Sequence, residues 1–99
     1  MDSILQDHKE CYVTGSTYNL HEHHIYPGAN RQVSERYGFK VWLRADWHNM
    51  SGYGVHFNSD LDLHLRRECQ KKFEETHSRE EFIKIIGMNF LEDENEKLY

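Results

Sequence analysis

The amino-acid sequence predicts a single α+β domain, with strands in its first half and helices in its second. Short β-prone runs separated by turn signals fill the chain before residue 44, whereas apolar residues recur every four positions between Leu61 and Phe73. A chain of 99 residues leaves room for one domain, and its 13% of aromatic residues can build a core although only 37% of the chain is hydrophobic. We therefore expect one domain over residues 1–91, followed by an acidic tail over residues 92–99.

The first predicted element is a β-hairpin. Cys11-Tyr12-Val13 is a β-prone run that stops at the turn signal Thr14-Gly15-Ser16. Residues 20–25 are its expected partner strand, which ends where Tyr26-Pro27-Gly28 breaks the extended pattern.

A short helix and a further strand are expected next. Residues 32–37 can form the helix, because Gly38 supplies the residue that commonly ends one. Phe39-Lys40-Val41-Trp42-Leu43 has the strongest β-propensity in the chain, and a loop rich in Asn, Ser and Gly follows over residues 49–54.

Two helices are predicted to complete the domain. Asn58 or Ser59 can cap the first, whose apolar stripe is formed by Leu61, Leu65, Cys69 and Phe73. Ser78 and Glu81 have the spacing of a capping box, in which each side chain bonds the backbone of the other residue. They open a last helix that ends at Gly87 and turns three apolar residues inward, namely Phe82, Ile85 and Ile86.

Composition restricts the class of protein. No apolar run approaches the roughly 20 residues of a membrane helix, and the start of the chain lacks the basic and apolar regions of a signal peptide. We therefore expect a cytoplasmic protein that has no membrane partner. Cys11 and Cys69 lie far apart without paired spacing, which favours reduced thiols over a disulfide.

The net charge of −5 disfavours long-range attraction to nucleic acid. The balance of charge is reversed between residues 24 and 41. This segment contains one acidic residue, Glu35, and three basic residues, Arg31, Arg36 and Lys40. A nucleic-acid contact is therefore expected to be local and sensitive to salt.

Histidine is the most informative residue type, with 8 copies in the chain. Neutral imidazole is the commonest protein ligand for transition metals and can move protons near neutral pH. Because side chains alternate along a strand, His21 and His23 should point to one face, and Glu22 and His24 to the other. This alternation suggests that His23 binds a metal while His24, at a bend beside the site, takes a proton from a water.

Two further histidines can complete the site. His48 and His56 follow the next predicted strand, where a chain reversal can return both to the first. Three imidazoles that leave open positions for water and phosphate are typical of a catalytic metal site rather than a closed structural one.

Three segments together resemble the HNH nucleases, the ββα-metal group, and within it the small phage and prophage proteins. These segments are Cys11-Tyr12-Val13-Thr14-Gly15, Asn19-Leu20-His21-Glu22-His23-His24-Ile25, and Val41-Trp42-Leu43 leading into His48. The resemblance covers roughly residues 11–64, and its most specific element is the histidine pair followed by Ile25.

The resemblance implies a role for each histidine. It implies that His23 is a metal ligand, that His24 is the general base that activates water for attack on a phosphodiester, and that His48 and His56 complete the metal shell. The metal would stabilise charge on the scissile phosphate and on the departing 3′ oxygen.

Three features depart from the pattern of the family. Many relatives carry a Cys-x-x-Cys that holds a structural zinc, whereas this chain has Cys11 and Thr14. The middle asparagine of the motif has two candidates, Asn30 and Asn49. Related sites often place a second histidine four residues after the first, but Gly52 stands there. His56 is the expected substitute, and the alternative is a metal held by His23 and His56 alone, with waters completing the shell.

Other polar residues have competing interpretations. Arg31 can contact a phosphate, or it can form an ordinary ion pair with Glu35 at helical spacing. His21 is either a structural strand residue or a support for the site. The remaining histidines are expected to be exposed, namely His8, His64 and His77.

Together these observations predict a metal-dependent HNH-type endonuclease that hydrolyses phosphodiester bonds in DNA and uses one divalent ion, Mg, Mn, Ni or Zn. One alternative is a non-catalytic module of the same fold that binds a protein or nucleic-acid partner, such as a phage inhibitor of a host defence nuclease. Another is a purely structural zinc domain, which would require four protein ligands and would unfold on chelation.

Overall fold

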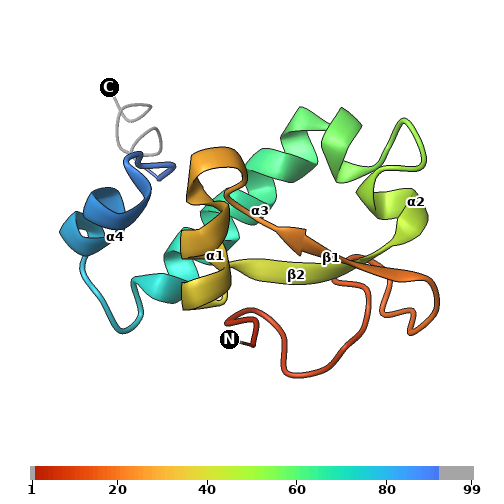
Figure 1. Cartoon of the computed structure of the whole chain (residues 1–99), viewed down its shortest axis with the longest axis horizontal. Helices are drawn as coiled ribbons and strands as arrows, with labels where there is room; N and C mark the ends of the chain where they lie inside the picture. Colours follow the sequence, from red (N-terminus) through yellow and green to blue (C-terminus); the bar gives the residue numbers. More distant parts are fainter. Residues whose placement is uncertain (1, 92–99) are drawn as a thin grey trace.

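The protein is built on a two-stranded antiparallel sheet that is surrounded by helices (Figure 1). The computed structural model describes residues 2–91, so the predicted acidic tail lies outside the described residues. The elements are β1 (Leu20–His24), α1 (Arg31–Tyr37), β2 (Lys40–Arg44), α2 (Ala45–His48), α3 (Ser59–Phe73) and α4 (Arg79–Ile86), with short 3-10 turns η1 (Gly28–Asn30) and η2 (Val55–Phe57). The predicted α+β class is therefore confirmed.

The pairing of the first strand differs from the prediction. β1 pairs with β2, in a register that places His23 opposite Val41 and His24 opposite Lys40. Cys11 instead begins a tight turn, in which the Gly15 amide donates to the Cys11 carbonyl at 2.8 Å. The predicted hairpin of residues 11–13 with residues 20–25 is thus wrong. The reason is burial: β2 offers two fully buried apolar residues on one face, whereas Val13 remains 40% exposed.

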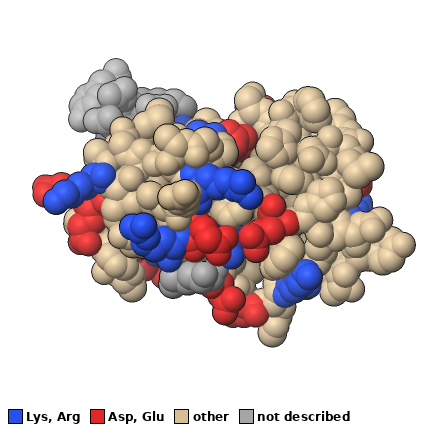
Figure 2. All heavy atoms as spheres, in the orientation of Figure 1, with Lys and Arg blue, Asp and Glu red and all other residues tan. Residues whose placement is uncertain are grey.

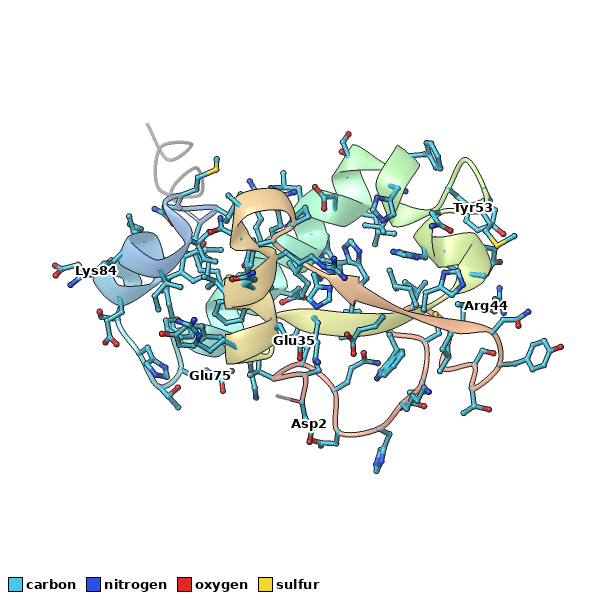
Figure 3. All side chains as sticks on the ribbon, viewed as in Figure 1. Asp2, Glu35, Arg44, Tyr53, Glu75 and Lys84 are labelled. Atoms are coloured by element: carbon cyan, nitrogen blue, oxygen red, sulfur yellow. The ribbon has the colours of Figure 1, made fainter. Side chains whose placement is uncertain are left out.

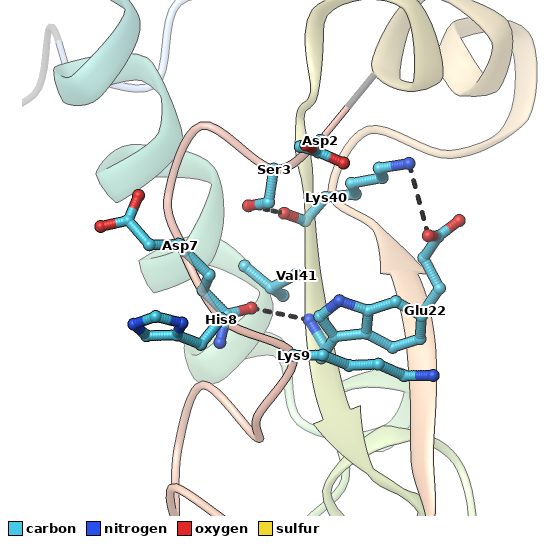
Figure 4. Close-up of a pocket in the computed structure, with 10 residues that line it drawn as sticks. Asp2, Ser3, Asp7, His8, Lys9, Glu22, Lys40 and Val41 are labelled. Carbon is cyan, nitrogen blue, oxygen red and sulfur yellow. Dashed lines mark hydrogen bonds and ion pairs between the residues drawn. The ribbon is translucent and has the colours of Figure 1, made fainter. Parts of the chain in front are cut away.

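The N-terminal segment covers the outer edge of β2. The Ser3 hydroxyl donates to the Lys40 carbonyl, and the Trp42 amide donates to Gln6 Oε1 at 2.8 Å. The Tyr12 amide donates to the Trp42 carbonyl, also at 2.8 Å. Figure 4 shows this segment beside β2, where it borders a pocket of about 410 Å³. Backbone groups of an edge strand that would otherwise be unpaired are thereby satisfied.

The hydrophobic core lies between the sheet and the helices of the second half of the chain. An aromatic cluster fills its centre, formed by Tyr26, Phe39, Phe73 and Phe82, with neighbouring ring centroids 5.5 to 6.1 Å apart. The Tyr26 hydroxyl donates to the Arg66 carbonyl at 2.7 Å, which ties the end of β1 to α3. Cys11 and Cys69 are buried free thiols, as expected.

The predicted helix boundaries are confirmed by their caps. Asn58 Oδ1 accepts from the Leu61 amide at the start of α3, and Ser78 and Glu81 form the capping box of α4. Gly38 ends α1 with a φ of 75°, a left-handed conformation that favours glycine. Within residues 2–91, no helix is both long enough and apolar enough to span a membrane.

Candidate metal centre

Three histidine rings from three separate elements meet on one side of β1. His23 comes from β1, His48 from the end of α2 and His56 from η2. Their ring centroids are 5.3 Å apart for His23 and His48, 5.4 Å for His23 and His56, and 4.6 Å for His48 and His56. The predicted chain reversal therefore brings both downstream histidines back to the first strand.

The loop between α2 and η2 positions His56 against His48. Gly54 makes this path possible, because a Cβ atom there would lie only 2.9 Å from the carbonyl oxygens of both Asp46 and His48. The loop is also held by Asp46, whose carboxylate accepts from the Tyr53 hydroxyl at 2.7 Å and from Arg44 Nε at 2.7 Å. Figure 3 shows Arg44 and Tyr53 together at the α2 end of the molecule.

The nitrogen atoms of the three rings are placed to share one ion. His48 Nε2 and His56 Nε2 lie 3.0 Å apart, and one nitrogen from each of the three rings falls within 4.8 Å of the others. His23 is only 5% exposed, and its buried Nε2 atom has no hydrogen-bond partner. An unpaired buried nitrogen is costly, and a metal ion is a partner that would satisfy it. The donor set therefore fits one divalent metal ion.

The electrostatics of the group favour the form of imidazole that binds metals. Burial of the ring, together with the neighbouring His48 and His56, lowers the pKa of His23 to about 3. Burial of the ring, together with the neighbouring His56 and His21, lowers the pKa of His48 to about 4. Both rings are therefore neutral at physiological pH, and a neutral ring offers a lone pair to a metal.

A fourth histidine supports the group from outside. His21 Nδ1 lies 3.0 Å from His48 Nδ1, on the opposite side of the His48 ring from the nitrogen that faces His56. If His48 Nε2 is the metal-binding atom, its Nδ1–H is available to donate to His21. Such an outer hydrogen bond fixes the tautomer and the orientation of a ligand ring. The position of His21 thus favours the predicted supporting role.

His24 belongs to a second group, on the opposite face of β1. Its Nε2 atom lies 2.9 Å from Glu35 Oε1 and 3.7 Å from Glu22 Oε1. Lys40 Nζ lies 2.7 Å from the other Glu35 oxygen and 3.3 Å from Glu22. Hydrogen bonds from Lys40 and His24 lower the pKa of Glu35 to about 2. Because the Lys40 ammonium already sits beside both carboxylates, this group is an ion-pair network rather than a second metal site.

A surface hollow of about 450 Å³ opens beside His24. Six residues line it, namely Glu22, His24, Gly28, Arg31, Gln32 and Glu35. Arg31 is an exposed residue at the start of α1, and the hollow brings it to the same side of the molecule as His24. The predicted phosphate contact and the predicted base therefore face a common space. This space lies on the other face of β1 from the histidine group, because His24 stands in the regular strand opposite Lys40 and not at the predicted bend.

The two candidate asparagines lie on different elements, and Asn49 directly follows His48 in the chain. Asn30 Nδ2 donates to the Ile86 carbonyl at 3.0 Å, which connects η1 to α4. Asn49 is an exposed residue at the C-terminal end of α2. Neither asparagine is a member of the histidine group.

Sequence reasoning did not single out two neighbours of the histidines. Glu35 contacts His24, and the charge of Arg66 contributes to the lowered pKa of His23. Arg66 lies on α3, where its Nε atom is 3.0 Å from Asp62 Oδ2. The sequence signals for Glu35 were the basic segment around it and its helical spacing from Arg31. Neither predicts its contact with His24, which depends on how α1 packs against β1.

No protein-family model, curated protein or solved structure matches the chain.

Proposed function

We propose that the protein is a metal-dependent endonuclease of the HNH type that hydrolyses phosphodiester bonds in DNA. The observation that carries the proposal is the convergence of His23, His48 and His56 on one point, with His24 next to His23 in the chain. Three imidazole ligands leave coordination positions open for water and phosphate, which is the arrangement of a catalytic metal site. The antiparallel pairing of β1 with β2 also supports the ββα-metal interpretation, although His48 and His56 lie on α2 and η2 and not on α3.

His24 remains the proposed general base, although in the structure it faces the hollow that Arg31 lines and not the histidine group. Glu35 accepts a hydrogen bond from His24 Nε2, and this leaves Nδ1 with a lone pair that can take a proton from water. Glu35 is itself held by Lys40, so the ring has a defined orientation. Arg31, on the same hollow, would bind a phosphate oxygen of the substrate. A divalent ion bound by the three histidines would supply the Lewis acid that stabilises charge on the phosphate and on the leaving oxygen. His24 would act on that same phosphate only if the end of β1 turned its side chain toward the histidine group.

The test is cleavage of supercoiled plasmid DNA by the purified chain with magnesium, manganese, nickel or zinc. We expect nicked or linear product with at least one of these metals and none with chelator. His24→Ala should abolish turnover and leave metal affinity nearly unchanged, because His24 lies on the other face of β1. His23→Ala should weaken metal binding itself. His64→Ala is the matched control, because His64 is an exposed histidine on α3 that pairs with Glu68.

Three results would contradict parts of this proposal. Full activity of His24→Ala would remove His24 from the mechanism. Absence of cleavage with every metal, despite normal metal binding, would favour the non-catalytic binding module. Global unfolding on chelation would instead favour a structural zinc domain.

A further inference from the structure

Two large apolar side chains stand exposed on the loop that carries the candidate metal ligands. Met50 is 71% exposed and Phe57 is 66% exposed. Both line one open hollow of about 360 Å³, together with Asn49, Ser51 and Gly52. Isolated exposed apolar residues are common, but two that share a hollow form a local patch. We call Met50 and Phe57 the apolar pair.

The apolar pair lies next to two of the candidate metal ligands in the chain. Met50 lies two residues after His48, and Phe57 directly follows His56. Phe57 also precedes Asn58, the cap of α3, but the fourth helical residue, with which an apolar residue at this position would pack, is Asp62. The helix therefore offers Phe57 no apolar partner at that position, and the ring is 66% exposed. The ring is therefore available to a ligand that reaches the histidines.

The loop holds the apolar pair in a defined position. The Ser51 hydroxyl donates to the Asp46 carbonyl, and the Gly54 amide donates to the Ser51 carbonyl at 3.1 Å. The Phe57 amide donates to the Gly54 carbonyl at 2.8 Å. The Tyr53 ring packs edge-on against Trp47, with centroids 4.7 Å apart. A ligand that contacts the pair would therefore bind a surface that is already ordered, at a small cost in conformational entropy.

The charge around the apolar pair indicates what it contacts. Residues 49–58 contain no Lys, Arg, Asp or Glu, and Figure 2 shows almost no charge over α2 and the loop that follows. The segment itself carries no carboxylate and offers no ammonium or guanidinium group to a phosphate, and the acidic residues that follow it are Asp60 and Asp62 in the first turn of α3. The chemistry that remains is an aromatic ring and a thioether, which contact the flat faces of nucleobases.

We propose that Met50 and Phe57 form a stacking site for unpaired nucleobases next to the phosphate held at the metal centre. Base faces are covered in a regular duplex, so the substrate class is single-stranded DNA or DNA whose strands are locally opened. This inference rests on the proposed function, because a phosphodiester at the histidines is what brings the neighbouring bases to the pair. A thioether and an aromatic ring also act as wedges between base steps in other DNA-binding proteins.

Binding can be tested without catalysis. Fluorescence anisotropy in chelator and at low ionic strength would compare a labelled oligothymidine with a hairpin duplex of equal length. We expect the native chain to bind the single strand more tightly. Phe57→Ala should weaken that binding at least about 5-fold, Met50→Ala should weaken it less, and Phe57→Trp should retain it. Met88→Ala is the matched control, because Met88 is 57% exposed and follows α4.

Several outcomes would overturn the inference. The native chain and Phe57→Ala could bind the single strand with equal affinity. The native chain could instead prefer the duplex, or it could bind neither oligonucleotide. A dimer that Phe57→Ala converts to monomer, with oligonucleotide affinity unchanged, would show that a second copy covers the pair. Circular dichroism of each variant would establish that it is folded.

The inference and the proposed function can fail separately. Loss of stacking with plasmid cleavage intact overturns the inference alone. Normal stacking with no cleavage under any metal overturns the endonuclease proposal and leaves a single-strand binding site.

Discussion

His48 Nε2 and His56 Nε2 lie 3.0 Å apart, although the two residues are eight positions apart in the chain. The two nitrogens can share one proton, or both can bind the same ion. The buried Nε2 of His23 has no hydrogen-bond partner, and it belongs to the same group. A shared proton would leave that third nitrogen unsatisfied, whereas one ion can satisfy all three.

The first prediction concerns the two downstream candidate ligands, His48 at the end of α2 and His56 in η2. His48→Ala and His56→Ala should each lower the affinity for nickel or zinc by more than about 100-fold, because each removes one of three donors. Isothermal titration calorimetry measures the affinity. His77→Ala should bind like the native chain, since His77 stacks on Phe73 away from the group. Unchanged affinity of His56→Ala would support a different ligand set.

The second prediction concerns His21. His21→Ala should lower metal affinity about 10-fold, because His48 would lose the acceptor that fixes its ring. His21→Asn should restore part of the affinity, since its side-chain oxygen can also accept a hydrogen bond. Turnover at saturating metal should remain close to that of the native chain. A loss as large as that of His48→Ala would instead make His21 a direct ligand.

The third prediction separates the orientation of His24 from metal binding. Glu35→Gln should reduce kcat about 10-fold or more while leaving KM for DNA and the metal affinity close to native, because the amide accepts a hydrogen bond without carrying charge. Steady-state cleavage of a labelled oligonucleotide measures both constants. Glu75→Gln is the control, because Glu75 is an exposed residue whose partner is Lys72. An unchanged kcat would show that the Glu35 charge has no part in turnover.

The fourth prediction uses two glycines of the same loop. Gly54→Ala should lower the free energy of unfolding by about 1–3 kcal/mol and should also weaken metal binding, because its Cβ would collide with the carbonyls of Asp46 and His48. Gly52→Ala should change neither quantity appreciably, since nothing lies within 4 Å of a Cβ there. Thermal unfolding and metal titration of the two variants test this difference. Equal behaviour of the two variants would contradict it.

The fifth prediction concerns acid stability of the metal-free protein. The pKa of His23 is about 3 in the folded chain, below its ordinary value of 6.5. Between these values the unfolded chain binds a proton that the folded chain does not, so the free energy of unfolding should fall as pH drops from about 6.5 toward 3. His23→Gln should reduce this slope, and His64→Gln should not. Urea unfolding at several pH values measures the slope, and an unchanged slope for His23→Gln would contradict the prediction.

Local sequence patterns predicted most of the helices and the two faces of β1. Alternation along a strand correctly separated His23 from His24, and the capping residues Asn58 and Ser78 correctly located two helix starts. These features depend on neighbours close in the chain, so the residues themselves carry the information.

The features that were not predicted depend on distant contacts. The β-propensity of residues 11–13 suggested a hairpin, but the partner of β1 is β2, which lies beyond an intervening helix. The ion pairs of Glu35 likewise depend on how α1 packs against the sheet. The spacing of Arg31 and Glu35 on a helix suggested an ion pair between them, and nothing in the local sequence indicated that Glu35 would also contact His24 and Lys40.

The two faces of β1 have a consequence for how the chain can change. One strand of five residues carries His23 for the histidine group and His24 for the ion-pair network. Deleting one residue within the strand would move every later side chain to the other face and exchange the two environments. The loop before β1 can vary in length without this effect, whereas Ile25 and Tyr26 directly after the strand are buried in the core. Insertions or deletions should therefore be tolerated before β1 but not inside it or directly after it.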